Sequence, residues 1–273
     1  MSKGITSTEG LIRKVFSLSK ADDELLFYRG HSDKDKYKLE PSLHRKTKHI
    51  ENEAVMFREL LISNPSDFIG DLSALDKLVR MQHHSLPTRL LDISSNPLMA
   101  LYFATKSKPD KTGQIIVFRI KKNEVKFFDS DTASCISNLA RLPKDDKEKL
   151  NLTLGIDDFN ETEEAKRLVH LIKEEKPFFL SRLIPGDLES IVCVKGKMNN
   201  NRILSQSGAF LLFGRNAVLP EAGTTSIGVE RIDINKDAKE KILGELDSLN
   251  INESTAFPYI ENSAKYISSK YST

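Results

Sequence analysis

The chain has 273 residues, with 41 Lys and Arg against 39 Asp and Glu, a net charge of +2 at pH 7, and 39% hydrophobic residues. This profile is typical of a globular protein with a substantial core, and it excludes disorder over most of the chain. The near-neutral balance also excludes a global field that would hold nucleic acid or anionic lipid by charge alone, although a local patch could still do so.

In chain order, the hydrophobic spacing of the first half predicts helices and strands in mixed succession. The polar, lysine-rich stretch 31–50 is expected to be a solvated connection without regular structure. The helix that begins at Pro97 is apolar on nearly every side and should be buried. The elements expected here are a helix near 11–16, a strand at 24–29, helices near 52–62 and 73–84, a strand at 88–93 and the helix from 97.

The second half is predicted to continue with strands at 113–120 and 124–128, which could form a hairpin, and with helices near 133–141 and 161–173. The charged KDDKEK tract at 144–149 is expected to be solvated surface. The remaining predictions are strands at 177–181, 190–194, 209–213 and 225–234, and helices at 236–249 and 259–271.

The order of these elements lacks a regular strand–helix alternation, so we expect an α+β fold with a mixed, mostly antiparallel sheet and packed helices. No internal repeat and no Pro- or Gly-rich linker divides the chain. We therefore expect one α+β domain over 1–234 and a helical C-terminal extension over 235–273 that packs on it.

The two cysteines, Cys135 and Cys193, have apolar neighbours and no disulfide or zinc spacing, so we expect both to be reduced core residues. The first ten residues lack the apolar run of a signal peptide, and the apolar stretches are far shorter than the about 20 residues of a membrane span. These features predict a cytoplasmic protein with no membrane partner.

Arg29 ends the strand LLFYRG, in which Leu25 and Phe27 share its face, so the guanidinium is expected at the edge of an apolar layer. An arginine there needs a carboxylate, a set of carbonyls or a ligand phosphate to satisfy its donors. Two interpretations stay open: an internal salt bridge to an acid such as Asp92, or a ligand contact.

The segment QHHSLPTRLLDISSNPLMALYFA, residues 82–104, is the densest in polar groups at element boundaries. The two-residue strand period places Thr88 and Asp92 on one side and Arg89 on the other. A helix N-terminus then opens at Pro97 and would suit a phosphate, with an arginine to neutralise it. The alternative is a rigid structural corner in which Ser95 or Asn96 caps the helix and Asp92 pairs with an arginine.

Metal and nucleotide-loop motifs are missing from the sequence. His83 and His84 are adjacent, so on a helix they point about 100° apart and are weak evidence for zinc. The chain has no HExxH, CxxC, GxSxG, GxxxxGK[ST] or GxGxxG. We expect no metal site, and the commonest signatures of serine hydrolases, P-loop enzymes and Rossmann domains are excluded.

The segments FYRGHSD, EPSLHR, QHHSLPTRLLDISSNPLMALYFA and RILSQSGAFLLFG together resemble the FRG domain, a prokaryotic and phage family named for its Phe-Arg-Gly motif. The resemblance covers about 27–214 with the motifs in the family's order. The chain departs by having Tyr28 directly before Arg29, His31 where glutamine is common, and His84 where tyrosine is frequent.

The same segments are more distantly similar to ADP-ribosyltransferases, in which a strand ending in Tyr-Arg-Gly places its arginine on NAD. Gln206 stands where those enzymes have a glutamate, and an amide cannot act as a general base, so Asp92 or Glu189 would have to supply the acid. The similarity implies catalytic roles for Arg29, Asp92 and Gln206, and NAD contacts for Tyr28, Gly30, His31, Thr88, Arg89, Asn96 and Tyr102.

These resemblances imply an NAD- or nucleotide-binding, ADP-ribosyltransferase-like effector of a prokaryotic or phage conflict system, either a defence protein or a toxin. NAD would be a substrate, and the acceptor would be a protein or nucleic acid that the residues do not identify. The alternative is a non-catalytic nucleotide-binding or protein-interaction module.

Overall fold

The computed structural model describes residues 4–18, 20–197 and 208–271. Within these ranges, seven strands form one sheet in the order β4-β5-β6-β2-β1-β3-β7, and all neighbours are antiparallel except β4 and β5. The predicted α+β fold with a mostly antiparallel sheet is confirmed. The strands are β1 (Glu24–His31), β2 (Leu90–Ser94), β3 (Gly113–Lys121), β4 (Lys126–Phe127), β5 (Ile191–Lys195), β6 (Gly208–Phe213) and β7 (Ile227–Ile234).

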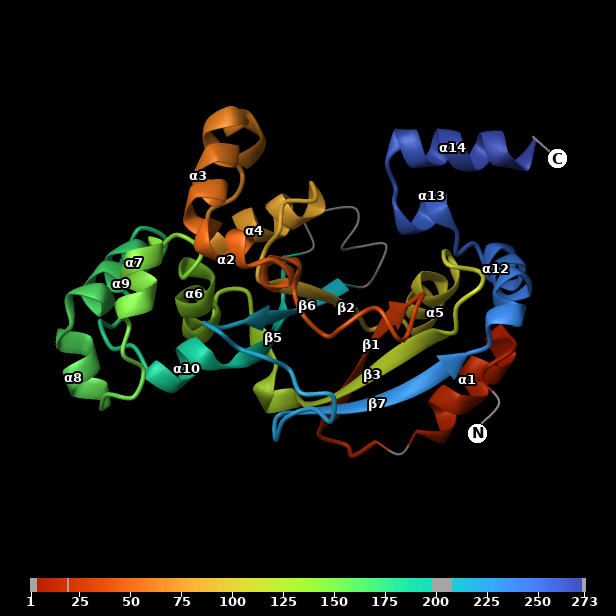
Figure 1. The fold of residues 1–273 in the computed structure, drawn as a ribbon, viewed down its shortest axis with the longest axis horizontal. Helices are drawn as coiled ribbons and strands as arrows, with labels where there is room; N and C mark the ends of the chain where they lie inside the picture. Colours follow the sequence, from red (N-terminus) through yellow and green to blue (C-terminus); the bar gives the residue numbers. More distant parts are fainter. Residues whose placement is uncertain (1–3, 19, 198–207, 272–273) are drawn as a thin grey trace.

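Helices gather at the two ends of this sheet (Figure 1). One group lies beside β5 and consists of α6 (Asp131–Asn138), α7 (Lys144–Lys149), α8 (Ile156–Glu161), α9 (Glu163–Lys173) and α10 (Pro185–Glu189). The other lies along β1, β3 and β7 and consists of α1 (Thr8–Ser17), α5 (Pro97–Thr105) and α12 (Lys239–Ser248), with α13 (Glu253–Ala256) and α14 (Ile260–Lys270) beyond. Between the groups are α2 (Thr47–Glu51), α3 (Glu53–Ser63) and α4 (Ala74–His83).

Both faces of the sheet are buried, because alternate side chains of each strand enter different clusters. On β1, Tyr28 packs in the cluster that α1, α5 and α12 cover, whereas Phe27 belongs to a cluster on the opposite face. Helices α4, α6 and α9 cover β5 and β6 in a third cluster. The apolar helix α5 is buried, as its composition predicts.

Three predicted elements differ in the structure. Residues 177–181 form no strand: Phe178 is 98% exposed, and these residues run as a loop that pairs with no strand. The expected hairpin between β3 and β4 is wrong, because β4 pairs in parallel with β5 near the other edge of the sheet. The stretch 31–50 contains a 3₁₀ turn, η1 (Ser42–Arg45), and most of α2. The first two outcomes depend on which strands are placed side by side, and such pairing partners are distant in sequence.

The charged tract KDDKEK is the short helix α7, and its centre is buried instead of solvated. The Lys147 ammonium donates to Glu53 Oε2 at 2.7 Å, and Asp146 accepts from Arg167 at 2.8 Å. Ion pairs with residues of other elements offset the cost of burying these charged side chains. The composition of the tract does not show that such partners exist elsewhere in the chain.

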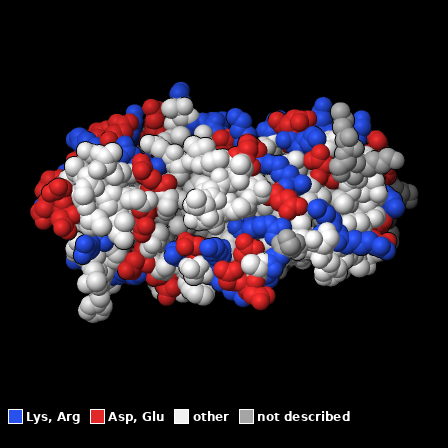
Figure 2. All heavy atoms as spheres, turned by 90° about the horizontal axis from the view of Figure 1, so that it is seen from below, with Lys and Arg blue, Asp and Glu red and all other residues white. Residues whose placement is uncertain are grey.

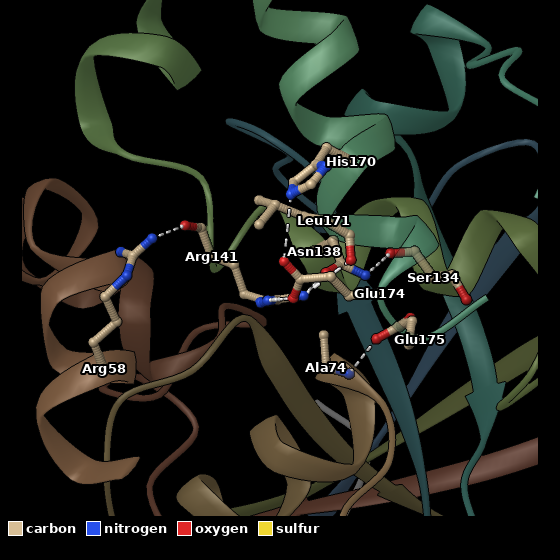
Figure 3. A network of polar contacts seen from close by, with 9 residues as sticks. All are labelled: Arg58, Ala74, Ser134, Asn138, Arg141, His170, Leu171, Glu174 and Glu175. Carbon is tan, nitrogen blue, oxygen red and sulfur yellow. Dashed lines mark hydrogen bonds and ion pairs between the residues drawn. The ribbon is translucent and has the colours of Figure 1, made fainter. Parts of the chain in front are cut away.

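A polar network ties the α6–α9 end of the molecule to α3 and α4 (Figure 3). Arg141 donates to Asn138 Oδ1 and to the Leu171 carbonyl, both at 3.0 Å, and forms an ion pair with Glu174. Arg58 of α3 donates to the Arg141 carbonyl at 2.8 Å. The carboxylate of Glu175 accepts from the amide of Ala74, the first residue of α4, at 2.6 Å. The network therefore fixes the start of α4, the helix that carries Gln82.

The C-terminal segment packs on α5, with Ile242 and Leu246 of α12 buried in the same cluster as that helix. Lys239 is 2% exposed, and its ammonium donates to three carbonyls, those of Ser32 (2.7 Å), Ser107 (3.1 Å) and Lys108 (2.8 Å). One side chain thus links α12 to the ends of β1 and α5.

Replacing Lys239 by alanine is expected to lower the free energy of unfolding by about 2–3 kcal/mol, because three carbonyls lose their charged donor. Lys241→Ala on the same helix should change it by less than about 1 kcal/mol, because the Lys241 side chain is 68% exposed. Urea denaturation followed by circular dichroism measures both values. Equal losses in the two variants would contradict the anchoring role of Lys239.

Candidate functional site

Strands β1 and β2 meet at one registered pair, Tyr28 with Ser94. Directly beside this pair, Arg29 Nη1 donates to the main-chain carbonyl of Asp92 at 2.6 Å. By the strand period, the side chains of Arg29 and Asp92 start from opposite faces of the sheet. The structure therefore brings these two predicted residues together, through a guanidinium and a strand carbonyl at the seam between β1 and β2.

The carboxylate of Asp92 meets an amide, that of Gln82 on α4. Gln82 Nε2 donates to Asp92 Oδ1 at 2.7 Å, and Thr88 Oγ1 donates to Gln82 Oε1 at 2.5 Å. This chain of hydrogen bonds fixes the orientation of the Gln82 amide, because each end of it has a defined partner. Gln206, the amide that the sequence placed here, lies outside the described residues.

Two cavities share Arg29 and Asp92 as lining residues. One cavity, of about 250 Å³, is mainly polar, and the other, of about 190 Å³, is more apolar. The polar cavity is also lined by Ser42, Arg45, Gln82 and Ser85. The apolar cavity is also lined by Tyr28, Gly30, Ile93, Ala100 and Phe103.

His31 orients the Arg29 guanidinium, because its Nε2 accepts from Arg29 Nε at 3.2 Å. The imidazole is 3% exposed and packs against the ring of Tyr37 with centroids 5.7 Å apart. Burial, followed by the positive charges of Arg29, Arg231 and Arg45, lowers the pKa of His31 to about 3. At neutral pH the ring is therefore uncharged, with Nε2 as the acceptor and the proton assigned to Nδ1.

Gly30 allows β1 to lie directly on α5. A Cβ atom at this position would be 1.9 Å from the carbonyl oxygen of Ala100 and 2.6 Å from the amide nitrogen of Ala104. Only glycine permits such an approach of two backbones. Gly30 thus sets the distance between the strand that carries Arg29 and the helix that supplies Ala100 and Phe103 to the apolar cavity.

The N-terminus of α5 is capped by its own chain. Asn96 Oδ1 accepts from the amide of Leu98 at 2.9 Å, and the amide of Asn96 donates to Ser94 Oγ at 2.9 Å. Asn96 therefore provides the cap that one of the two interpretations of this corner expects, and Arg29 contacts Asp92 through the main-chain carbonyl. The Leu98 amide is therefore already satisfied within the protein.

Three further residues from the predicted set lie away from the two cavities. Arg89 is 3% exposed, binds both carboxylate oxygens of Glu53 at 2.8 and 2.6 Å, and lines a different cavity. Tyr102 is buried among apolar residues, and this burial raises its pKa to about 12. Glu189, the alternative acid, lies at the end of α10 and lines neither cavity. The sequence alone does not show which side of a strand or which face of a helix will line a given cavity.

Sequence reasoning did not select Arg45, Ser42, Gln82 or Phe103 as site residues. Ser42 and Arg45 lie in the EPSLHR segment, which was noted only as part of a family motif. Gln82 extends an apolar stripe of α4, and a partly buried amide requires partners. That requirement was the signal for its contact with Asp92.

On the face shown in Figure 2, acidic and basic side chains are interspersed around uncharged surface. No group of three His, Cys, Asp or Glu residues within the described ranges is placed to hold a metal ion. Every described helix is too short or too polar to cross a bilayer. Cys135 and Cys193 are free and buried, and burial raises the pKa of each thiol to about 12.

A family model matches one part of the chain. Residues 24–113 match the family model of the FRG domain, a shorter range than the 27–214 over which the motifs are similar. No curated protein and no solved structure matches the chain. The described residues that line the two cavities at the seam lie between Tyr28 and Phe103. These residues of the candidate site therefore fall within the part of the chain that matches the FRG domain.

Proposed function

We propose that the FRG domain of this protein binds a nucleotide of the NAD class at Arg29 and uses it in ADP-ribosyltransferase-like glycosyl transfer. The observation that carries this proposal is the pair of cavities, one polar and one apolar, that share Arg29 and Asp92. Ligand pockets usually measure about 300–1,000 Å³. Each cavity is smaller than this, so a dinucleotide would have to occupy both.

The polar cavity has the chemistry of a phosphate and ribose site. Arg29 and Arg45 supply two guanidinium groups, whose planar donors suit phosphate oxygens. Ser42 and Ser85 add hydroxyl groups that can hydrogen-bond to sugar oxygens. The neutral His31 holds the Arg29 fork without adding a competing charge.

The apolar cavity suits a flat ring. Tyr28 and Phe103 line it from β1 and α5, and aromatic side chains pack favourably against aromatic rings of a ligand. Ile93 and Ala100 extend the apolar lining. A nicotinamide or adenine ring here would leave its attached phosphates at Arg29.

Asp92 is the carboxylate available for chemistry at this site. Transfer of a glycosyl group from NAD breaks the bond between the ribose C1′ and nicotinamide, and positive charge develops on the ribose in the transition state. A fixed carboxylate stabilises such charge. Gln82 holds Asp92 Oδ1, so the orientation of this carboxylate is set before a substrate binds.

The cellular part of the proposal is a role as an effector in a prokaryotic or phage conflict system, which rests on the family resemblance. Expression is then expected to be toxic or to protect against phage, and Arg29→Ala and Asp92→Ala should each remove the effect. An unchanged phenotype in both variants at equal protein level would contradict a catalytic role at this seam.

Titration calorimetry with NAD and ADP-ribose tests the binding step. Arg29→Ala is expected to weaken binding by about 10- to 100-fold, because a charge-assisted hydrogen-bonding group is lost. Arg45→Ala should also weaken binding, with little effect on the fold, because Arg45 is exposed and its hydrogen bond within the described residues is a long one, 3.5 Å, to the Glu40 carbonyl. Arg13→Ala, an exposed arginine on α1, is the matched control and should leave the affinity unchanged.

The alternatives give different results in the same assays. No heat with any nucleotide would favour the protein-interaction module, and binding without transfer of labelled ADP-ribose would favour a non-catalytic nucleotide-binding module. Transfer that Asp92→Asn abolishes while nucleotide affinity persists would identify an enzyme. Equal loss of binding in Arg13→Ala and Arg29→Ala would contradict a specific site.

A further inference from the structure

A third and larger cavity, of about 510 Å³, lies apart from the seam between β1 and β2. No described residue lines both this cavity and either of the cavities at Arg29. Its volume falls within the range of small-molecule sites, about 300–1,000 Å³. Its walls come from the segment 39–53, from α7 and from the residues that follow β6.

The floor of the cavity holds two cations against one carboxylate. Glu53 accepts two hydrogen bonds from Arg89, at 2.8 and 2.6 Å, and a third from Lys147 at 2.7 Å. Their side chains are 4%, 4% and 11% exposed. Arg89 also donates to the carbonyl of Phe213 at 2.8 Å, so its fork is occupied. Lys147, with three donors, is the cation that can serve a ligand.

Two acidic residues of the cavity lie at its rim. Glu51 and Glu148 are 41% and 63% exposed, and both pair with Lys144, at 3.2 and 3.7 Å. Arg215, also at the rim, donates to the carbonyls of Leu150 and Glu148. The floor therefore holds two cations, Arg89 and Lys147, against the single carboxylate of Glu53, and the excess charge there is positive.

The walls between floor and rim are apolar. Leu43 and Phe213 are almost fully buried, and Leu219 is 5% exposed. His44 packs edge-on against Phe213 with centroids 5.8 Å apart. A ligand in this space would bury an apolar body along the walls and place a charged end at Lys147.

We infer that this cavity binds a small organic anion with an apolar body, whose acidic group pairs with Lys147 above the Glu53–Arg89 ion pair. The cluster at the floor has two cations and one carboxylate, and burying the excess positive charge without a counterion is costly. A bound anion neutralises this charge. The apolar walls stabilise the body of the ligand by removing it from water. The site is independent of the nucleotide proposed at Arg29.

The probe for this site is 1-anilinonaphthalene-8-sulfonate, which carries one sulfonate on an apolar ring system. Its fluorescence titration is expected to show one saturable site on the folded full chain. Lys147→Met should weaken this binding by about tenfold or more, because the charged partner is lost. The variant keeps the Glu53–Arg89 pair, so we expect it to fold. Lys149→Met, an exposed residue of the same helix, is the matched control and should bind as the wild type does.

Two further measurements separate charge from a general effect on the fold. N-phenyl-1-naphthylamine has the same rings without the sulfonate, and its affinity should be unchanged in Lys147→Met. Val218→Glu adds a negative charge at an exposed rim position, so it should weaken binding of the anionic probe several-fold without disturbing the core. Arg29→Ala should leave the probe affinity unchanged, so failure of the nucleotide proposal does not affect this test.

Competition identifies the ligand body. Displacement of the probe by octanoate supports an aliphatic carboxylate, and displacement by 4-phenylbutyrate supports an aromatic one. Displacement by neither, equal affinity in Lys147→Met and wild type, or binding that does not saturate would each overturn the inference.

Discussion

Glu53→Ala is expected to lower the free energy of unfolding by about 3–5 kcal/mol, the usual cost of breaking a buried ion pair. The substitution leaves Arg89 and Lys147, two buried cations, without the carboxylate that both contact. Chemical denaturation of the full chain followed by circular dichroism measures this loss.

The matched control is Glu51→Ala, two residues earlier in the chain. Glu51 pairs with Lys144 at 3.2 Å, but both side chains are about 40% exposed, so its removal should cost less than about 1 kcal/mol. A loss of equal size in the two variants would show that the cluster at Glu53 contributes no more than a surface pair.

The Glu53 cluster also predicts a pH dependence of stability. Burial alone would raise the pKa of Glu53, but the charges of Arg89 and Lys147 outweigh it and lower the pKa to about 2. Because the unfolded value is near 4.5, the contribution is fully present above that pH and is lost as the pH falls toward 2. The stability gap between wild type and Glu53→Gln should therefore narrow by up to about 1.4 kcal/mol per pH unit over this window. A gap that stays constant between pH 5 and pH 3 would contradict the lowered pKa.

Gly30→Ala is expected to lower the free energy of unfolding by about 3 kcal/mol or more, because the added methyl group must overlap backbone atoms of α5. The contact distances, 1.9 Å to the Ala100 oxygen and 2.6 Å to the Ala104 nitrogen, can be relieved only by moving the helix from the strand. Thermal and urea denaturation measure the loss. Loss of the proposed nucleotide binding should accompany it.

Gly244→Ala provides the opposite control. Nothing lies within 4 Å of the Cβ position at Gly244, which is exposed within α12. Alanine there should stabilise the protein by about 0.5–1 kcal/mol through its higher helix propensity. If Gly30→Ala were as stable as wild type, β1 and α5 could not be as close as described.

Local sequence patterns predicted what depends on neighbours along the chain. The strand that carries Arg29, the buried helix from Pro97 and a cap at Ser95 or Asn96 follow from side-chain period, composition and capping chemistry. The strand continues to His31, the helix is buried, and Asn96 is the cap. Residues 177–181 had the composition of a strand but no strand to pair with, so the prediction there was wrong.

The sequence by itself determined the α+β class, the core strands and the candidate residues Arg29 and Asp92. Tertiary structure alone decided which polar groups meet: Gln82 with Asp92, Arg89 with Glu53, and Lys147 from a tract expected to be solvated. The physical reason is that a buried charge or amide is stabilised by whichever partner the fold places within hydrogen-bonding distance. Those partners lie 10, 36 and 94 positions away in the chain, beyond the reach of local periodicity.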